Sequence, residues 1–205
     1  MRVGVIGSGR IGGTVAALLA TAGHDVRIAN SRGPASLRDL AAERLRPATV
    51  EEAAAHGEVV LVATPLAAYD ALPRDALAGT VVVDAGNYYP SRDGQIGALD
   101  DDSTTSTEWL AAKLPGARVV KAFNTVHWEI LRDKGDADAG DERLVVLVAG
   151  DDAEAKQRVE RLIEDIGFAP VDQGGLADGG RLQQPGAERY GKVLTLREAL
   201  ADTPS

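Results

Sequence analysis

The stretch VGVIGSGRIGGTVAALLATAGHDVRIANSRGP (residues 3–34) decides the fold expected for this 205-residue chain. Its first residues, 3–7, form an apolar run typical of a buried strand, and the run leads directly into glycines. A segment rich in Ala and Leu, residues 10–22, has the character of a helix, and residues 25–30 read as a second strand. The segment therefore predicts a strand–turn–helix–strand unit whose first turn is made of glycine.

Gly7, Gly9 and Gly12 have the spacing G-x-G-x-x-G, and each glycine has its own physical reason. Gly7 permits a tight turn, Gly9 lets a pyrophosphate approach the backbone, and Gly12 lets the helix pack close to the strand. The helix start adds free N–H groups and the positive end of its dipole. A glycine-rich turn without a ligand could have the same sequence pattern, but the strand before it and the helix after it favour a dinucleotide site. The predicted binding residues of this turn are Gly7, Ser8, Gly9, Arg10, Ile11 and Gly12.

The end of the second strand indicates which dinucleotide the site takes. An NAD site usually places Asp or Glu about 20 residues after the glycines, against the ribose 2′-hydroxyl. Here the strand ends in Asn30, Ser31 and Arg32, and the nearest acidic residue, Asp25, lies at the beginning of the strand. Arg32 can pair with a 2′-phosphate, and its neighbours can donate hydrogen bonds. NADP(H) is therefore predicted in preference to NAD, although Arg32 could also be a solvated loop cation.

The rest of the chain continues the alternation of strands and helices. A Rossmann-like α/β fold is predicted, with a doubly wound, mostly parallel sheet and a short C-terminal helical segment. Polar loops are expected at residues 86–103 and 133–142, and an interrupted helix at 181–200. The further expected strands cover residues 58–63, 80–85, 117–123, 143–150 and 168–171. The further expected helices cover residues 35–44, 50–56, 66–72, 103–113, 124–133 and 152–166.

Composition limits the possible partners and compartments. The chain has 22 Lys and Arg against 31 Asp and Glu, a net charge of -9 that argues against nucleic acid and anionic membranes as partners. It contains no cysteine, so disulfides and thiolate chemistry are excluded. No signal-peptide pattern and no apolar stretch of about 20 residues is found, so a cytoplasmic protein without a membrane span is expected.

Ligands of an open parallel sheet lie beyond the carboxyl ends of its strands, so polar residues at those ends are candidates. Thr64 and Pro65 follow one strand, Asn87 follows the next, and Asn124 and Thr125 follow a third. These groups can hold a carboxamide or a planar heterocycle, but none is a general acid or base. No catalytic residue is therefore assigned, and Asp84 at a strand end receives no role.

The other chemistry-bearing side chains are expected to be structural. His24, His56 and His127 are too scattered to suggest a metal site, and none is predicted. Of the three, only His127 could face the pocket, because it follows the corner at Asn124. Trp109 and Trp128 are predicted to be packing residues.

Taken together, several motifs resemble the NADPH-dependent reductases of the deazaflavin coenzyme F420, and also the soluble oxidoreductase domain of the six-transmembrane metalloreductases. The resemblance covers most of the chain. It rests on IGSGRIGGTVAALLATAGHDV, NSRGP, LVATP, VDAGNYY, VVKAFNT, LVAGDDAEAK and the D-x-GGL turn with GRLQQPG.

The resemblance implies a single NADP-binding domain over residues 1–205, with residues 172–205 as a cap over the cleft. It implies that Ser31 and Arg32 lie at the 2′-phosphate and that Thr64 and Pro65 lie near the pyrophosphate and ribose. It also implies a homodimer. Near the nicotinamide it places Asn87, Phe123, Asn124 and Thr125.

The predicted function is an NADP(H)-dependent oxidoreductase that transfers hydride directly between the nicotinamide and a small-molecule acceptor, F420 or a flavin such as FMN or FAD. Transfer between two rings needs orientation more than a strong acid or base. Two alternatives remain open. One is an NADP-binding sensor without turnover, and the other is a reductase of a small carbonyl or imine, with a proton drawn from water or from Tyr88.

Overall fold

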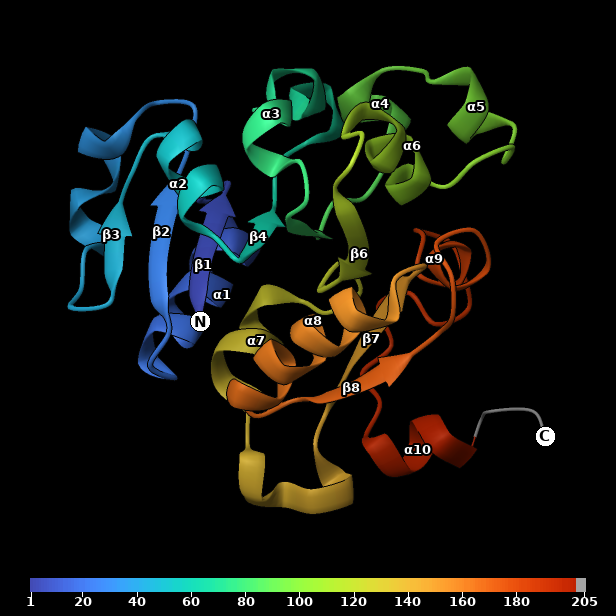
Figure 1. The fold of residues 1–205 in the computed structure, drawn as a ribbon. Coiled ribbons are helices and arrows are strands. Elements are labelled where there is room, and N and C mark those ends of the chain that lie inside the picture. Colours follow the sequence, from blue (N-terminus) through green and yellow to red (C-terminus); the bar gives the residue numbers. More distant parts are fainter. Residues whose placement is uncertain (202–205) are drawn as a thin grey trace.

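Eight strands form one sheet in the order β3-β2-β1-β4-β5-β6-β7-β8 in the computed structural model, which describes residues 1–201 (Figure 1). β1 to β6 are parallel, β7 runs antiparallel to β6, and β8 is parallel to β7. The predicted α/β class with a mostly parallel sheet is confirmed. The strands are β1 (Arg2–Ile6), β2 (Asp25–Ala29), β3 (Leu45–Pro47), β4 (Val59–Val62), β5 (Val81–Asp84), β6 (Arg118–Ala122), β7 (Val145–Gly150) and β8 (Ala169–Asp172).

Helices connect the strands and cover both faces of the sheet. The α-helices are α1 (Arg10–Thr21), α2 (Val50–His56), α3 (Arg74–Leu77), α4 (Pro90–Asp93), α5 (Gly97–Asp100), α6 (Ser106–Lys113), α7 (Trp128–Lys134), α8 (Ala153–Asp165), α9 (Asp178–Leu182) and α10 (Leu196–Ala201). Three 3₁₀ helices, η1 (Pro34–Leu40), η2 (Leu66–Ala71) and η3 (Ala137–Glu142), complete the set found within the described residues. None of these helices is long and apolar enough to span a lipid bilayer.

The Val-rich strands are buried because alternate residues enter two separate apolar layers. In β4, Val59 and Leu61 pack in the layer that holds the buried residues of α1, α7 and α8. Val60 and Val62 point the other way, into the layer beneath α2, η2, α3 and α6. Since both faces are covered, the strands show no polar alternation, which is the pattern read from the sequence.

The first crossover after β2 differs from the expected helix over 35–44. The chain forms the short 3₁₀ helix η1, with Leu37 buried, and then a short edge strand, β3, which was not predicted. β3 ends in Pro47, and proline is tolerated there because it lies in an edge strand.

Four other segments also differ from expectation. The expected loop at 86–103 contains the short helices α4 and α5, and the loop at 133–142 contains η3. The helix expected from residue 124 begins only at Trp128. Between α9 and α10 the chain is not helical, so the expected helix over 181–200 is wrong for its central part. The part of the expected cap at 202–205 lies outside the described residues.

Candidate cofactor-binding site

A cleft of about 440 Å³ lies at the carboxyl ends of β1, β2 and β4. Eight residues predicted to bind the cofactor line it: Gly7, Ser8, Gly9, Asn30, Ser31, Arg32, Thr64 and Pro65. They come from three separate turns, which the parallel sheet brings to one edge. Its other lining residues in the described part of the chain are apolar, including Ile6, Val50 and Leu72.

The three glycines of the first turn differ in what surrounds them. Gly7 has a φ of +112°, and a Cβ there would lie 2.3 Å from the carbonyl oxygen of Ala63. A Cβ on Gly12 would lie 2.0 Å from the carbonyl oxygen of Gly7, so α1 can pack this close only on glycine. A Cβ on Gly9, by contrast, would meet no protein atom within 4 Å. The turn is tightly packed on the protein side and open on the side of the cleft.

α1 begins at Arg10, directly after Gly9. The cap residue Gly9 offers no side-chain hydrogen bond to the first turn of the helix. N–H groups at a helix start need partners and carry partial positive charge. The open backbone at Gly9 therefore lies next to donors that suit a phosphate.

Asn30 connects the glycine turn to the end of β2. Its Nδ2 group donates to Ser8 Oγ at 3.0 Å and to Ser36 Oγ at 3.1 Å. Its Oδ1 accepts a hydrogen bond from the backbone N–H of Arg32 at 2.9 Å. Asn30 thus holds the Ser31–Arg32 corner in place, and its amide hydrogens are already used within the protein.

Arg32 is the one charged residue among the described residues that line the cleft. Its side chain is exposed, and within residues 1–201 its guanidinium makes no hydrogen bond or ion pair. A free cation beside an open backbone turn gives this end of the cleft a positive potential. This end of the cleft therefore suits an anionic group.

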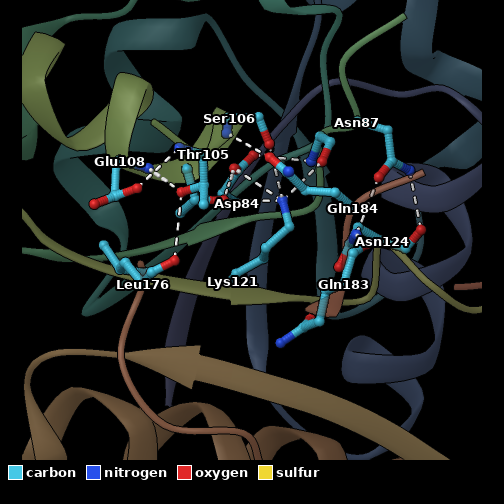
Figure 2. A network of polar contacts seen from close by, with 12 residues as sticks. Asp84, Asn87, Thr105, Ser106, Glu108, Lys121, Asn124, Leu176, Gln183 and Gln184 are labelled. Atoms are coloured by element: carbon cyan, nitrogen blue, oxygen red, sulfur yellow. Dashed lines mark hydrogen bonds and ion pairs between the residues drawn. The ribbon is translucent and has the colours of Figure 1, made fainter. Parts of the chain in front are cut away.

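A second group of polar residues lies at the carboxyl ends of β5 and β6. Asn87 Nδ2 donates to the backbone carbonyl of Asn124, and Asn124 Nδ2 donates back to Asn87 Oδ1, both at 3.0 Å (Figure 2). Asn124 Nδ2 also donates to the carbonyl of Gln183 at 2.7 Å. The two amides lock the two strand ends together, while Asn124 Oδ1 is buried without a partner among the described residues.

Phe123 and Thr125 flank Asn124 and are both buried. Phe123 has a φ of +67°, a left-handed conformation that is costly for a bulky residue. This turn reverses the chain between β6 and α7 and delays the start of the helix. Such a strained corner at a strand end fits a ligand-binding position, although no lining of the 440 Å³ cleft comes from it.

The remaining predicted turn residues face away from the cleft. Arg10 lies with its guanidinium 5.5 Å from the ring centroid of Trp128 and lines a shallow depression on the α1 side. Ile11 is half-buried and packs against the main core. Ser8 and Gly9 border both the cleft and the depression, so the glycine turn is reachable from two sides.

The histidines take structural positions. His24 is buried, its Nδ1 lies 3.2 Å from the N-terminal amine of Met1, and burial lowers its pKa. His127, which could have faced the pocket, is exposed, with Nδ1 3.3 Å from a Glu129 carboxylate oxygen. The hydroxyl of Tyr88 bonds with Gly94 and Asp100 in its own loop.

The sequence analysis missed a buried ion pair beneath the Asn87 corner. Lys121 in β6 and Asp84 at the end of β5 are both fully buried, with Nζ 3.6 Å from Oδ2 (Figure 2). Lys121 Nζ donates to Gly86 O at 3.1 Å, Ser106 Oγ at 3.3 Å and Thr107 Oγ1 at 2.9 Å. A lysine inside a Val-rich strand was the available signal, since lysine is almost never fully buried without a partner.

Asp84 is satisfied by its own set of donors. Its Oδ1 accepts from Tyr69 at 2.7 Å and from the Gly86 N–H at 2.8 Å, and its Oδ2 accepts from Thr107 at 2.6 Å. A Cβ on Gly86 would lie 2.1 Å from the Tyr69 hydroxyl, so only glycine fits. Burial lowers the pKa of Lys121, and the charge of Asp84 opposes that shift. Through these bonds to Gly86, the Asp84–Lys121 pair fixes the backbone directly before Asn87.

Residues 176–190 of the C-terminal segment reach the same edge of the sheet. Thr105 Oγ1 donates to Leu176 O at 3.4 Å, and the Ser106 N–H donates to Gln184 Oε1 at 3.1 Å (Figure 2). The hydroxyl of Tyr190 lies 3.3 Å from Asn87 Nδ2. Residues far apart in the sequence thus meet where β5 and β6 end.

Comparison with known proteins supports the resemblance read from the motifs. A family model described as NADP oxidoreductase, coenzyme F420-dependent, matches residues 2–88. The metalloreductase STEAP3 of Rattus norvegicus is 32% identical over 179 residues, which are 86% of this chain and 34% of that protein. The chain therefore spans about a third of the length of the curated relatives that it matches.

Solved structures match over nearly the whole chain. A hypothetical protein of Sinorhizobium meliloti has 33% sequence identity and a TM-score of 0.83, and 95% of each chain is covered. A proposed F420-dependent NADP-reductase of Arthrobacter sp. FB24 has 32% identity and a TM-score of 0.72, and 89% of each chain is covered.

Proposed function

We propose a function from one premise: the chain belongs to the family of coenzyme F420-dependent NADP oxidoreductases. We infer that it binds NADP(H) in the cleft at the ends of β1, β2 and β4, and that it transfers hydride between NADP(H) and a deazaflavin or flavin ring. The single observation that carries NADP(H) binding is the pairing, in one cleft, of an open backbone turn at Gly9 with the guanidinium of Arg32, which has no partner within residues 1–201. The hydride transfer rests on the family.

The residues of the cleft fit NADP(H). Gly9 leaves room for the pyrophosphate beside the start of α1, where N–H groups can donate to it. Arg32, held by Asn30 through its backbone N–H, can pair with the 2′-phosphate. No carboxylate lines the cleft in the described part of the chain, so nothing there selects the 2′-hydroxyl of NAD. These features support NADP over NAD.

The polar edge at the ends of β5 and β6 suits the nicotinamide and the acceptor. NADPH, when bound, supplies the hydride, and the task of the protein is to bind and orient the two rings. The locked amides of Asn87 and Asn124 fix this edge, and the buried Oδ1 of Asn124 has no hydrogen-bond partner within residues 1–201. The contacts of residues 176–190 with this edge support a role of that part of the C-terminal segment as a cap over it, within a single domain, whereas α10 packs against β7 and β8.

The structure supports one of the two alternative functions as well as the proposed one, and the other less well. An NADP sensor needs only the cleft, so the same Gly9 and Arg32 features favour it equally. A reductase of small carbonyls or imines would need a proton donor, and the Tyr88 hydroxyl is engaged with Gly94 and Asp100. The structure offers less for this third function than for transfer between rings.

A direct assay tests the proposal. The purified protein is titrated with NADPH and NADH, and it is then mixed with NADPH and, in turn, F420, FMN, FAD and a small cyclic imine, while absorbance of nicotinamide and acceptor is followed. Preferential binding of NADPH with turnover of one ring acceptor supports the proposal. NADPH binding without any turnover supports the sensor, turnover of the imine alone supports the third function, and absence of NADPH binding overturns all three. A cytoplasmic location and a homodimer stay predictions.

A further inference from the structure

Two tyrosines that the sequence analysis left without a role lie at the edge where β5 and β6 end. Tyr89 follows β5, and Tyr190 comes from the C-terminal segment, 101 residues later. Their hydroxyl oxygens are 2.5 Å apart, and both side chains are half-buried. Asn87 Nδ2 also donates to the Tyr190 hydroxyl at 3.3 Å, so the pair adjoins the locked amides.

The hydrogen count of this pair leaves one donor unused. Asn87 supplies a hydrogen to the Tyr190 oxygen, and one phenolic hydrogen occupies the short bond between the tyrosines. Whichever tyrosine donates in that bond, the other phenolic hydrogen has no acceptor within residues 1–201. The site therefore presents one O–H donor that a ligand can use.

Neighbouring charged residues hold the tyrosine pair in place. The guanidinium carbon of Arg92 lies 5.0 Å from the ring centroid of Tyr89, and Arg92 also bonds to the carbonyl of Asn87. The charge of Arg92 is balanced by Asp93, whose side chain is fully buried and also accepts from the Tyr89 N–H. The donor is thus preorganised in surroundings without an unpaired charge, which suits an uncharged ligand edge.

We infer that Tyr89 and Tyr190 are the acceptor-binding pair of this site, which donates one hydrogen bond to a carbonyl oxygen or ring nitrogen on the edge of a planar heterocyclic hydride acceptor. The inference rests on the proposed function and deepens it, because it assigns residues to the acceptor. Burial and the neighbouring Tyr89 hydroxyl raise the pKa of Tyr190 well above its ordinary value. Its hydroxyl therefore stays protonated and suits a hydrogen bond better than proton transfer.

Equilibrium binding tests the inference without requiring turnover. Wild type, Tyr190→Phe, Tyr89→Phe and Tyr88→Phe are titrated with oxidised FMN and oxidised F420, each with and without saturating NADP⁺, which does not react with them. Loss of one neutral hydrogen bond predicts about tenfold weaker binding of the ring probe to Tyr190→Phe, with a similar or smaller loss for Tyr89→Phe. NADP⁺ affinity, measured separately, stays unchanged.

Tyr88→Phe is the matched control, because its hydroxyl bonds with Gly94, Asp100 and the Ile96 N–H within its own loop. Tyr88→Phe removes more internal hydrogen bonds than Tyr190→Phe, so any loss of binding caused by general structural damage should be visible in it. We expect Tyr88→Phe to bind the probe as wild type does. Equal binding by Tyr190→Phe and wild type overturns the inference, as does an equal loss in Tyr88→Phe. Failure of wild type to bind either probe, while it binds NADP⁺, overturns the inference and leaves the cofactor cleft intact. Failure to bind NADP⁺ or NADPH is instead a failure of the proposed function.

Discussion

Replacing Arg32 by alanine tests the electrostatic basis of cofactor choice. Arg32 is exposed, is the one charge among the described lining residues of the cleft, and makes no side-chain bond within residues 1–201. Its removal should therefore cost the fold little. A hydrogen bond to a charged group contributes about 1.5–3 kcal/mol, and exposure to salt places this one near the lower end. A loss of about 1.5–2 kcal/mol corresponds to roughly 10- to 30-fold weaker NADPH binding.

The assay is a paired titration with NADPH and NADH at two salt concentrations. NADH lacks the 2′-phosphate, so its affinity should not change in Arg32→Ala. Arg32→Lys keeps the charge but loses the planar fork, and it should fall between wild type and Arg32→Ala. Arg38→Ala removes another exposed cation, on η1 outside the cleft, and controls for the general field of the protein.

The pattern of losses decides the outcome. The NADPH loss should shrink as salt concentration rises, because the contact lies near solvent. Equal losses for NADPH and NADH would mean that Arg32 does not recognise the 2′-phosphate. An unchanged preference for NADPH in Arg32→Ala would refute the reasoning outright, since no other cation lines the described part of the cleft.

Three further predictions concern binding and stability. Gly9→Val should fold normally, because its Cβ meets no protein atom within 4 Å, but it should no longer bind NADPH or NADH. Gly12→Val should instead lower the melting temperature, because its Cβ would lie 2.0 Å from a backbone oxygen. Normal nucleotide binding by folded Gly9→Val would contradict the glycine argument. Lys121→Met should destabilise by about 3 kcal/mol in denaturant titration, because it leaves the buried charge of Asp84 unpaired, and adding Asp84→Asn should recover part of the loss. His24 has a lowered pKa in the fold, so the unfolded chain binds the proton more readily; stability should fall as the pH drops below 6.5, and His24→Gln should flatten that part of the profile.

The glycine turn and the corner at Arg32 could be predicted from sequence because their information is local. Gly7, Gly9 and Gly12 lie in one βα turn, and the structure gives each the surroundings expected from its spacing. Arg32 was chosen as a candidate because the end of the second strand has no carboxylate, and the structure places Arg32 in the lining of the cleft. Three predicted residues differ: the amide hydrogens of Asn30 bind Ser8 and Ser36, and Arg10 and Ile11 do not line the cleft.

Asn87 and Asn124 were expected near the nicotinamide, but the contacts at the ends of β5 and β6 could not be predicted because they are long-range. Asn87 meets Tyr190 across 103 residues, and Asn124 meets Gln183 across 59. No local pattern marks such pairs, and the C-terminal segment that supplies them was expected to be helical where it is not. Lys121 was missed because it lies inside an apolar run, and the whole run was interpreted as a strand buried on both faces without attention to the lysine.

The location of the strongest charges bears on which acceptor the site favours. Lys121 directs its hydrogen bonds to Gly86, Ser106 and Thr107, beneath the edge of the sheet, and both groups of its ion pair with Asp84 are fully buried. A ketone or imine needs a proton as its reduction proceeds, and both groups of this pair are buried and already bonded within the protein. The proposed transfer between two rings needs alignment instead, and the buried pair fixes the backbone beside Asn87 through Gly86. The arrangement therefore uses its ionisable groups to hold geometry and leaves neutral donors at the rim, which favours a heterocyclic acceptor over a small carbonyl.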